Sequence, residues 1–471
     1  MSEQRVLYRR IVREFGKASV QPRQKRNNEI LHNFRVTFQH RANSKNSQEF
    51  ARDVENFTTF LSSQTQYKAL MERYNPLFDL TAEERIEATA RRRLHVSSPE
   101  TLDALNKVSH YLTHEHGPVA LPTETVYGLG ANALNTKASS RIFSVKGRPP
   151  DNPLIVHVSS SSMLASLLPS DYQIPPMYRL LMKHFWPGPL TLLFPTNPKI
   201  IPSIITANQP TVAIRMPSNP IARALISVAD VPIAAPSANS SGKPSPTRAE
   251  HVLRDIGGKI RFILDGGPCD VGLESTVVDG LHEDGNLRVL RPGGLPVEEI
   301  ERVLQMQNPS GSVPKVLVHR RDFTDALLEQ APTTPGMKYR HYSPSIPVIL
   351  LMTSKAPDAV QCLTPSALIQ QLQDTALYDN PPKHIGLLMP SDSSLFQQLI
   401  PFSELQWNHF SLGSEREPAV MAQRLFDGLL TLEERSVDLI LIQGIDEARE
   451  GLAFMNRVIK AAGETRWISL G

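Results

Sequence analysis

The sequence predicts a protein of mixed α and β structure (α/β, or α+β) with a helical segment in front. Two observations support the mixed class. After residue 97, short apolar runs of strand length alternate with short helical patterns. Proline makes up 39 of 471 residues, about 8% against a usual ~5%, which favours turns and irregular crossings over long helices. Before residue 97 only a helical period is visible, which predicts a separate segment.

Residues 1–96 are predicted to form a small helical bundle, because apolar residues recur there every three or four positions. Residues 1–95 hold 18 Lys+Arg and 11 Asp+Glu, so this segment carries +7 and the remaining 376 residues carry −4. The asymmetry fits either an acidic partner, such as nucleic acid or a membrane surface, or a solvated basic helix face. The runs that show the period are Leu7, Ile11, Phe15; Leu31, Phe34, Phe38; and Phe50, Val54, Phe57, Leu61.

Residues 97–305 are predicted to form one domain built on a large twisted sheet. Helices are expected near 137–145, 177–185, 219–227 and 247–254. The runs with strand composition are Val119–Leu121, Leu154–Val158, Leu190–Phe194, Val212–Arg215, Ile233–Ala235, Ile260–Leu264, Thr276–Val278 and Val289–Leu290.

Residues 306–345 are rich in Pro, Ser and Thr without a period, which indicates a connector. Residues 346–471 return to alternating strands and helices and predict a smaller three-layer α/β domain. Its expected strands are Val348–Met352, Ile385–Met389 and Leu439–Ile442, and Val420–Leu432 is an amphipathic helix pattern.

Composition excludes several classes of protein. Two cysteines, Cys269 and Cys362, cannot form a disulfide framework or a four-cysteine zinc site. No apolar run approaches the ~18 residues of a membrane span, and the first residues lack a signal-peptide pattern, so we expect a soluble cytoplasmic protein. The motifs GxxxxGK[ST], GxGxxG and HExxH are all missing, so any nucleotide is bound by another architecture.

Three polar segments lie next to predicted strands and are candidate binding loops. Segment 122–130, PTETVYGLG, offers hydroxyls followed by glycine, although a plain Thr/Gly turn fits equally well. Segment 146–153, KGRPPDNP, places Lys146 and Arg148 two residues apart on an expected extended loop, where both would point the same way toward an anion. Segment 234–247, AAPSANSSGKPSPT, runs from a strand into an expected helix start at Thr247, whose N–H groups suit phosphates.

Further candidates are Arg215 after a strand, the Glu274-Ser275-Thr276 turn, and Arg291-Pro292-Gly293. Each is weak alone, and a histidine such as His157 is more often packed than functional. Together they supply cations and hydroxyls with few carboxylates, which is the composition of an anion site.

The same segments, with LESTVVD and LRPG, resemble the YrdC-like family of threonylcarbamoyl-AMP synthases over about residues 105–300. The string PGMKYRHYSP and the block after it resemble the two-domain members. The resemblance implies that L-threonine, bicarbonate (or CO2) and ATP give threonylcarbamoyl-AMP and pyrophosphate. The product would pass to a downstream tRNA-modifying transferase that forms threonylcarbamoyladenosine in tRNA.

The resemblance also implies roles for individual residues. Mg2+ is expected on the ATP phosphates without a metal cage built by the protein. Tyr342 in the connector is expected to close over the site as part of a lid, with Lys338 and Arg340 assisting. The residues expected around threonine and its carbamate are Thr125, His157, Arg215, Ser237 and Ser275. Those expected to hold ATP are Lys146, Arg148, Asn152, Asn239, Thr247, Arg291 and Tyr342. Those expected to act in catalysis are Lys146, Arg148 and Ser237.

The first segment resembles a different group. Leu7-Tyr8-Arg9-Arg10 with Phe15 is similar to the LYR-motif helical proteins, and stretches near Phe34 and Tyr74 are similar to the mitochondrial ATP synthase assembly factor of that group. Eight Lys+Arg against two Glu in residues 1–26 are compatible with mitochondrial location, or with a basic bundle helix. A true fusion and two merged neighbouring genes both explain the chain.

Two other functions remain open at this stage. The chain could be a module that binds double-stranded RNA or tRNA, but the −4 charge after residue 95 disfavours backbone affinity. It could also be a mitochondrial assembly factor without catalysis, but none of the site positions named above is replaced. A further alternative is a carbamoyl-transferring relative of the same fold. Such relatives carry additional metal- or acyl-phosphate-handling domains, and these are not seen in this sequence.

Overall fold

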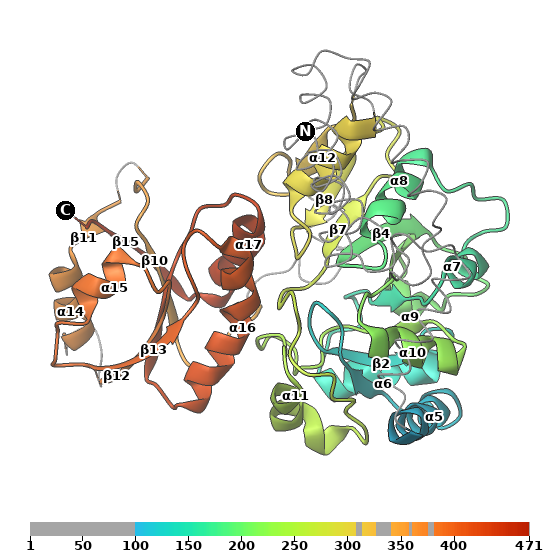
Figure 1. Cartoon of the computed structure of the whole chain (residues 1–471), viewed down its shortest axis with the longest axis horizontal. Coiled ribbons are helices and arrows are strands. Elements are labelled where there is room, and N and C mark those ends of the chain that lie inside the picture. The colour runs from blue at the N-terminus through green and yellow to red at the C-terminus, as the bar shows by residue number, and fades with distance from the viewer. Residues whose placement is uncertain (1–98, 308–312, 326–340, 358–359, 375–380, 471) are drawn as a thin grey trace, which may run out of the picture. The chain divides into compact units, whose positions relative to one another are not determined.

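The computed structural model describes residues 99–307, 313–325, 341–357, 360–374 and 381–470. These residues form two sheets with helices packed on them, which confirms the predicted fold class (Figure 1). The expectations for residues 1–96, and for Lys338 and Arg340, lie outside the described residues.

The first sheet is mixed and has nine strands in the order β1-β2-β6-β3-β5-β4-β7-β8-β9. Adjacent strands pair parallel in β3/β5, β4/β7 and β8/β9, and antiparallel in the other pairs. The strands are β1 (Val119–Leu121), β2 (Gly128–Asn132), β3 (Ile155–His157), β4 (Leu190–Pro195), β5 (Thr211–Arg215), β6 (Ile233–Ala234), β7 (Thr276–Asp279), β8 (Leu287–Arg291) and β9 (Val316–Val318).

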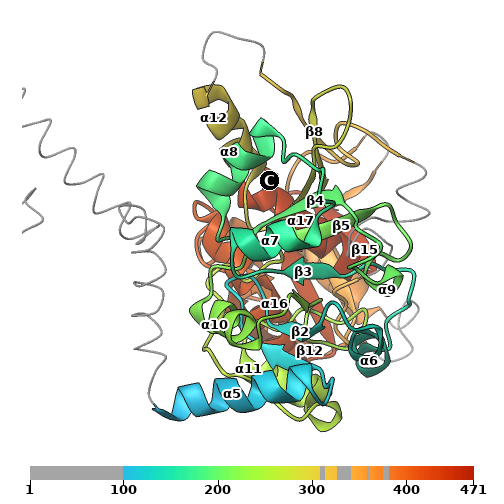
Figure 2. The ribbon, with the colours of Figure 1, turned by 90° about the vertical axis from the view of Figure 1, so that its right-hand side faces the viewer.

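Helices cover this sheet and bury their apolar faces against it. The largest core cluster joins the strands to residues of α6, α7, α8 and α12, while a second cluster packs α5 and α10 together over β1 (Figure 2). The helices are α5 (Pro99–Thr113), α6 (Thr136–Lys146), α7 (Ser161–Leu167), α8 (Pro176–Phe185), α9 (Ser203–Thr206), α10 (Pro220–Ala229), α11 (Ala249–Ile256) and α12 (Val297–Gln307).

The second sheet is parallel and has six strands in the order β11-β15-β10-β14-β12-β13. Helices α14 and α15 pack on one face and α16 and α17 on the other, which confirms the predicted three layers (Figure 1). The elements are β10 (Val348–Met352), β11 (Cys362–Leu363), α14 (Pro365–Gln373), β12 (His384–Met389), α15 (Ser394–Leu399), β13 (Gln406–Ser411), α16 (Pro418–Glu434), β14 (Leu439–Gln443), α17 (Glu450–Ala461) and β15 (Glu464–Ile468).

Three expectations about local structure were wrong. Residues 260–264 are not a strand, because the pairing with β1 is limited to a bridge between Ile263 and Ala120. The connector is not irregular throughout, since β9 joins the first sheet with Val316 and Val318 buried and Leu317 between them less buried, the alternation of a strand. Helix α11 begins at Ala249 rather than at Thr247.

Candidate functional site

A row of side chains crosses the nine-stranded sheet and brings three predicted site residues together. His157 of β3 lies opposite Arg215 of β5, and Arg215 lies opposite Thr191 of β4. Thr191 lies opposite Val277 of β7, which lies opposite Arg291 of β8. Directly opposite partners project on the same face of a sheet, so the strand order places His157, Arg215 and Arg291 on one face. All three line one cavity of about 50 Å³.

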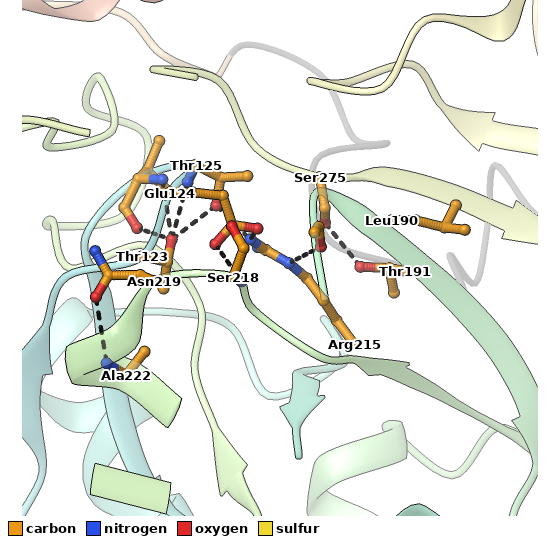
Figure 3. Close-up of polar contacts among 12 residues, drawn as sticks. Thr123, Glu124, Thr125, Leu190, Thr191, Arg215, Ser218, Asn219, Ala222 and Ser275 are labelled. Atoms are coloured by element: carbon orange, nitrogen blue, oxygen red, sulfur yellow. Dashed lines mark hydrogen bonds and ion pairs between the residues drawn. The ribbon is translucent and has the colours of Figure 1, made fainter. Parts of the chain in front are cut away.

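The loop between β1 and β2 fixes the Arg215 guanidinium from one side. Nη1 of Arg215 donates to Oγ1 of Thr125 at 2.8 Å, and Nη2 forms an ion pair with Oε1 of Glu124 (Figure 3). Nε donates to the carbonyl of Gly188 at 3.1 Å. Because a guanidinium carries five N–H groups, donors remain beyond these three contacts to face the cavity.

The segment from Glu274 to Ser275 closes the opposite side. The hydroxyls of Ser275 and Thr191 lie 2.7 Å apart (Figure 3). Nη2 of Arg291 donates to the Ser275 carbonyl at 2.8 Å. Gly293 lies two residues after Arg291, and a Cβ atom at this position would lie 2.3 Å from the Glu274 carbonyl oxygen. Glycine is therefore required at this position for the two segments to approach each other.

Lys146 and Arg148 do not lie together on an extended loop, which corrects the sequence expectation. Lys146 is the last residue of α6, and Gly147 with φ 61° ends that helix, so the two cations take different partners. Arg148 lines the cavity and donates to the Pro153 carbonyl at 2.9 Å. Lys146 is buried outside the cavity lining, where its ammonium donates to the carbonyls of Ser237 and Asn239.

Only part of the loop after β6 lines the cavity. Ser237 lines the cavity, whereas Asn239 lies behind it and donates to the carbonyls of Ser240 and Lys243. Thr247 precedes α11, and its N–H faces Nδ1 of His251 at 3.3 Å. The helix start predicted at Thr247 for phosphates therefore lies outside the cavity lining.

Eight of the twelve predicted site residues line the cavity: Thr125, Arg148, His157, Arg215, Ser237, Ser275, Arg291 and Tyr342. The other four, Lys146, Asn152, Asn239 and Thr247, do not. Of these, Asn152 is linked to the site indirectly, because its backbone carbonyl accepts from Nε of Arg148 at 3.2 Å.

Burial and the arginines set the charge of the cavity. Burial and then Arg215 lower the pKa of His157 to about 3, so its imidazole is neutral at pH 7, and its Nδ1 is buried without a hydrogen-bond partner. Burial and then Arg291 lower the pKa of Arg148 to about 10, which keeps it charged. Burial alone would raise the pKa of Glu274, but Arg457, Arg291 and Ser245 outweigh it and lower that pKa to about 2. The lining therefore carries a net positive charge at neutral pH.

Three residues of the site are not evident from the sequence. Glu124, the ion-pair partner of Arg215, lies within a segment that also fits a plain turn. Glu274 is a candidate without a role, and His341 lies unremarked in the string PGMKYRHYSP. A glutamate amid hydroxyls in PTETVYG was the available signal for Glu124, since a buried carboxylate requires a cation. For Glu274 the signal is absent, because its partner Arg457 lies far along the chain.

Two absences apply to the described part of the chain. No group of three or more His, Cys, Asp or Glu side chains there is arranged to hold a metal ion. No helix in the same residues is long and apolar enough to cross a membrane.

Comparison with known proteins identifies three regions. Residues 112–293 match a family model described as "Telomere recombination", of the Sua5, YciO and YrdC proteins. Residues 295–463 match the C-terminal domain of threonylcarbamoyl-AMP synthase. Residues 5–94 match a model described as Complex1_LYR-like, in agreement with the resemblance noted for the first segment.

Curated relatives cover both sheets. The threonylcarbamoyl-AMP synthase of Schizosaccharomyces pombe is 42% identical over 392 residues, 79% of this chain and 91% of the relative. That of Bacillus subtilis is 41% identical over 352 residues, 75% of this chain and 91% of the relative. A crystal structure of Pyrococcus abyssi Sua5 complexed with L-threonine is 39% identical, with a TM-score of 0.62 over 77% of this chain and 96% of that one. From about residue 100 onward, the chain is a member of the threonylcarbamoyl-AMP synthase family of enzymes.

Proposed function

We propose that the protein makes threonylcarbamoyl-AMP from L-threonine, bicarbonate or CO2, and ATP, at the cavity between His157, Arg215 and Arg291. The observation that carries the proposal is the row of cross-strand partners, which sets two arginines and a neutral histidine on one face. The reaction forms two bonds. The threonine nitrogen attacks CO2 and loses a proton to give a carbamate, and a carbamate oxygen then attacks the α-phosphorus of ATP as the bond to pyrophosphate breaks.

The threonine half of the site is assigned to the side of Arg215. Its remaining N–H groups suit the substrate carboxylate, because the contacts to Thr125, Glu124 and Gly188 hold the guanidinium in one orientation. His157 lines the same cavity with a neutral imidazole, which is assigned to the side of the amine and carbamate. Ser237 and Ser275 contribute hydroxyls to the same space.

The nucleotide half is assigned to Arg148 and Arg291, whose charges suit the phosphates and the transition state of adenylyl transfer. Lys146, Asn152, Asn239 and Thr247 stay predictions as nucleotide residues. In this structure Lys146 instead holds the loop that carries Ser237. Mg2+ is proposed to arrive with ATP as part of the substrate. The described lining does not suit a resident ion, because both oxygens of Glu274 are engaged, by Arg457 and by Ser245.

Tyr342 and His341 are proposed to act as a lid. Both line the cavity, and Tyr342 is buried against Phe426 of α16 with ring centroids 5.2 Å apart. Since both residues line the cavity and Tyr342 is buried there, we propose that this segment moves for the nucleotide to enter. Closure after entry would exclude water from a reactive mixed anhydride.

The remaining expectations are kept as proposals. The product passes to a downstream tRNA-modifying transferase. Contact of the protein with tRNA or double-stranded RNA is a separate proposal, on which the assignment of the catalytic residues does not depend. The proposed domain limits are 1–96, 97–305 and 346–471, with residues 306–345 as a connector that adds β9 to the first sheet. Location in the cytoplasm is proposed, with mitochondria as the alternative suggested by the Complex1_LYR-like segment.

The proposal is tested by pyrophosphate release from ATP with each substrate omitted in turn. We expect release only when L-threonine and bicarbonate are both present, and loss of release in Arg215→Met and Ser237→Ala. A matched control is Arg261→Met, which removes an exposed arginine outside the cavity. Release that does not depend on threonine, or that survives Arg215→Met, would contradict the assignment.

A further inference from the structure

One arginine from the helices that pack on the six-stranded sheet contacts a residue that lines the cavity. Arg457 lies on α17, yet it is fully buried against Glu274, just before β7, and Pro292, just after β8, in the nine-stranded sheet. Its Nε and Nη2 each donate to Oε2 of Glu274 at 3.1 Å, and Nη1 donates to the Pro292 carbonyl. A charge in such a position is tolerated only with a full set of partners.

These two contacts lie beside two residues assigned to the reaction. Glu274 directly precedes Ser275, and Pro292 directly follows Arg291. The Arg457 guanidinium therefore ties together the two segments that carry Ser275 and Arg291. The second oxygen of Glu274 accepts from Oγ of Ser245 at 2.6 Å, which extends the same connection to the loop after Ser237.

The same guanidinium also contacts the lid. It lies over the ring of Tyr342, 5.8 Å from the centroid, within the range of a cation–π contact. The Tyr342 hydroxyl interacts with the Glu274 carboxylate, so Arg457, Glu274 and Tyr342 form one connected group. Parts of the chain from β8, α17 and the connector thus meet at a single buried ion pair.

Docking the two sheets does not require a buried arginine. Arg248 pairs with Asp427 of α16 at 2.9 Å, and Arg449 pairs with Glu299 of α12 at 3.3 Å, both with the arginine about half exposed. Such surface pairs need little desolvation, whereas a fully buried pair has to overcome a large desolvation cost. Arg457 does not line the cavity itself, but it is buried directly behind Glu274, which does, and this placement indicates a role in the site.

We propose that Arg457 is a positioning residue for the synthase reaction: it holds Glu274 so that Ser275, Arg291 and Tyr342 keep the geometry in which ATP and the carbamate react. The helical layer of the six-stranded sheet is then a working part of the site. This inference rests on the proposed function.

The electrostatics predict a signature that a purely structural residue would not give. Burial favours the neutral form of Glu274, and Arg457 is the foremost cause that opposes it. Without Arg457, the pKa of Glu274 rises, and the ionised form is lost as pH falls through the new value. The charged and titratable groups around Glu274 are Arg457 and Lys460 of α17, Arg291 of β8, Lys146 of α6, and His341 and Tyr342 of the connector.

The test compares Arg457→Met and Arg457→Lys with Arg449→Met in the full chain. Arg449 is the matched control, because it precedes the same helix and also joins the two sheets, but its partner Glu299 lies outside the cavity lining whereas Glu274 lies in it. Turnover number and KM for ATP and threonine are measured by pyrophosphate release between pH 5.5 and 9. Each variant's melting temperature and its affinity for a non-hydrolysable ATP analogue are measured beside them.

We expect Arg457→Met to lose about 100-fold in kcat/KM for ATP, about tenfold of it in kcat, with a new loss of activity toward acidic pH. Arg457→Lys should recover part of the loss, since it keeps the charge but not the two-donor contact. Analogue binding should weaken about tenfold in Arg457→Met and stay unchanged in Arg449→Met.

Two results would overturn the proposal. One is an Arg457→Met protein with a lower melting temperature but with wild-type kcat, KM and pH profile. The other, which decides the matter if Arg457→Met does not fold, is an Arg457→Lys protein with wild-type kinetics. A wild-type protein without threonine-dependent release would instead contradict the proposed function, and the analogue-binding comparison would still decide the role of Arg457.

Discussion

Replacing Glu124 by Gln should destabilise the nine-stranded sheet by more than any surface ion pair can. The side chains of Glu124 and Arg215 are only 5% and 4% exposed, and the second oxygen of Glu124 accepts from the Ser218 N–H at 3.1 Å. Glutamine keeps the shape but leaves the Arg215 charge uncompensated. Breaking a buried pair in this way costs about 3–5 kcal/mol, a large part of a typical folding free energy of about 5–15 kcal/mol.

Urea unfolding followed by the fluorescence of Trp186 measures this cost locally. The indole of Trp186 donates to the Leu190 carbonyl at 2.7 Å, close to Gly188, which accepts from Arg215. The chain has three tryptophans, so a Trp407→Phe, Trp467→Phe background leaves Trp186 as the sole reporter.

The matched control is Glu115→Gln. Glu115 pairs with Arg261 at 3.3 Å, but the two side chains are 49% and 61% exposed, so we expect a loss below about 1 kcal/mol. Equal losses in Glu124→Gln and Glu115→Gln would refute the view that the buried pair holds Arg215 in place.

Three further predictions concern Glu274, Lys146 and Tyr342. The pKa of Glu274 is about 2 in the folded protein against 4.5 ordinarily, so its ionised form adds about 3 kcal/mol of stability above pH 4.5, which is lost as pH falls toward 2. The difference in urea midpoint between wild type and Glu274→Gln should therefore shrink between pH 4.5 and pH 2. A difference that stays constant over that range would contradict the assignment. Lys146→Met should lower turnover by about tenfold or more, because the carbonyls of Ser237 and Asn239 lose their shared donor, and unchanged pyrophosphate release would show that this clamp is dispensable. Tyr342→Ala should raise the ratio of AMP to threonylcarbamoyl-AMP among the products, since water reaches the mixed anhydride; a wild-type ratio would argue against the lid.

The sequence predicted seven strands of the described nine-stranded sheet and three of the described six-stranded sheet, because these are short apolar runs between turn residues. The missed strands are rich in glycine (β2), polar (β13 and β15) or only two or three residues long (β9 and β11). Strand order could not be predicted, because it depends on pairings between strands far apart in the chain. Without that order the row from His157 to Arg291 is invisible in the sequence.

The site residues were predicted by motif, and the local geometry around them was predicted less well. Lys146 and Arg148 were expected to point the same way, but the left-handed Gly147 ends α6 between them and sends them to different partners. Arg457 was not predicted at all. It sits on an amphipathic helix where an arginine ordinarily faces solvent, and its partner Glu274 is 183 positions away in the chain.

The most direct measurement is the mass of the nucleotide product formed from ATP, L-threonine and carbon-13 bicarbonate. We predict a single new nucleotide with the mass of threonylcarbamoyl-AMP, heavier by one carbon-13, together with pyrophosphate. AMP or ADP as the only nucleotide product, from protein shown to be folded and supplied with all three substrates, would contradict the synthase assignment.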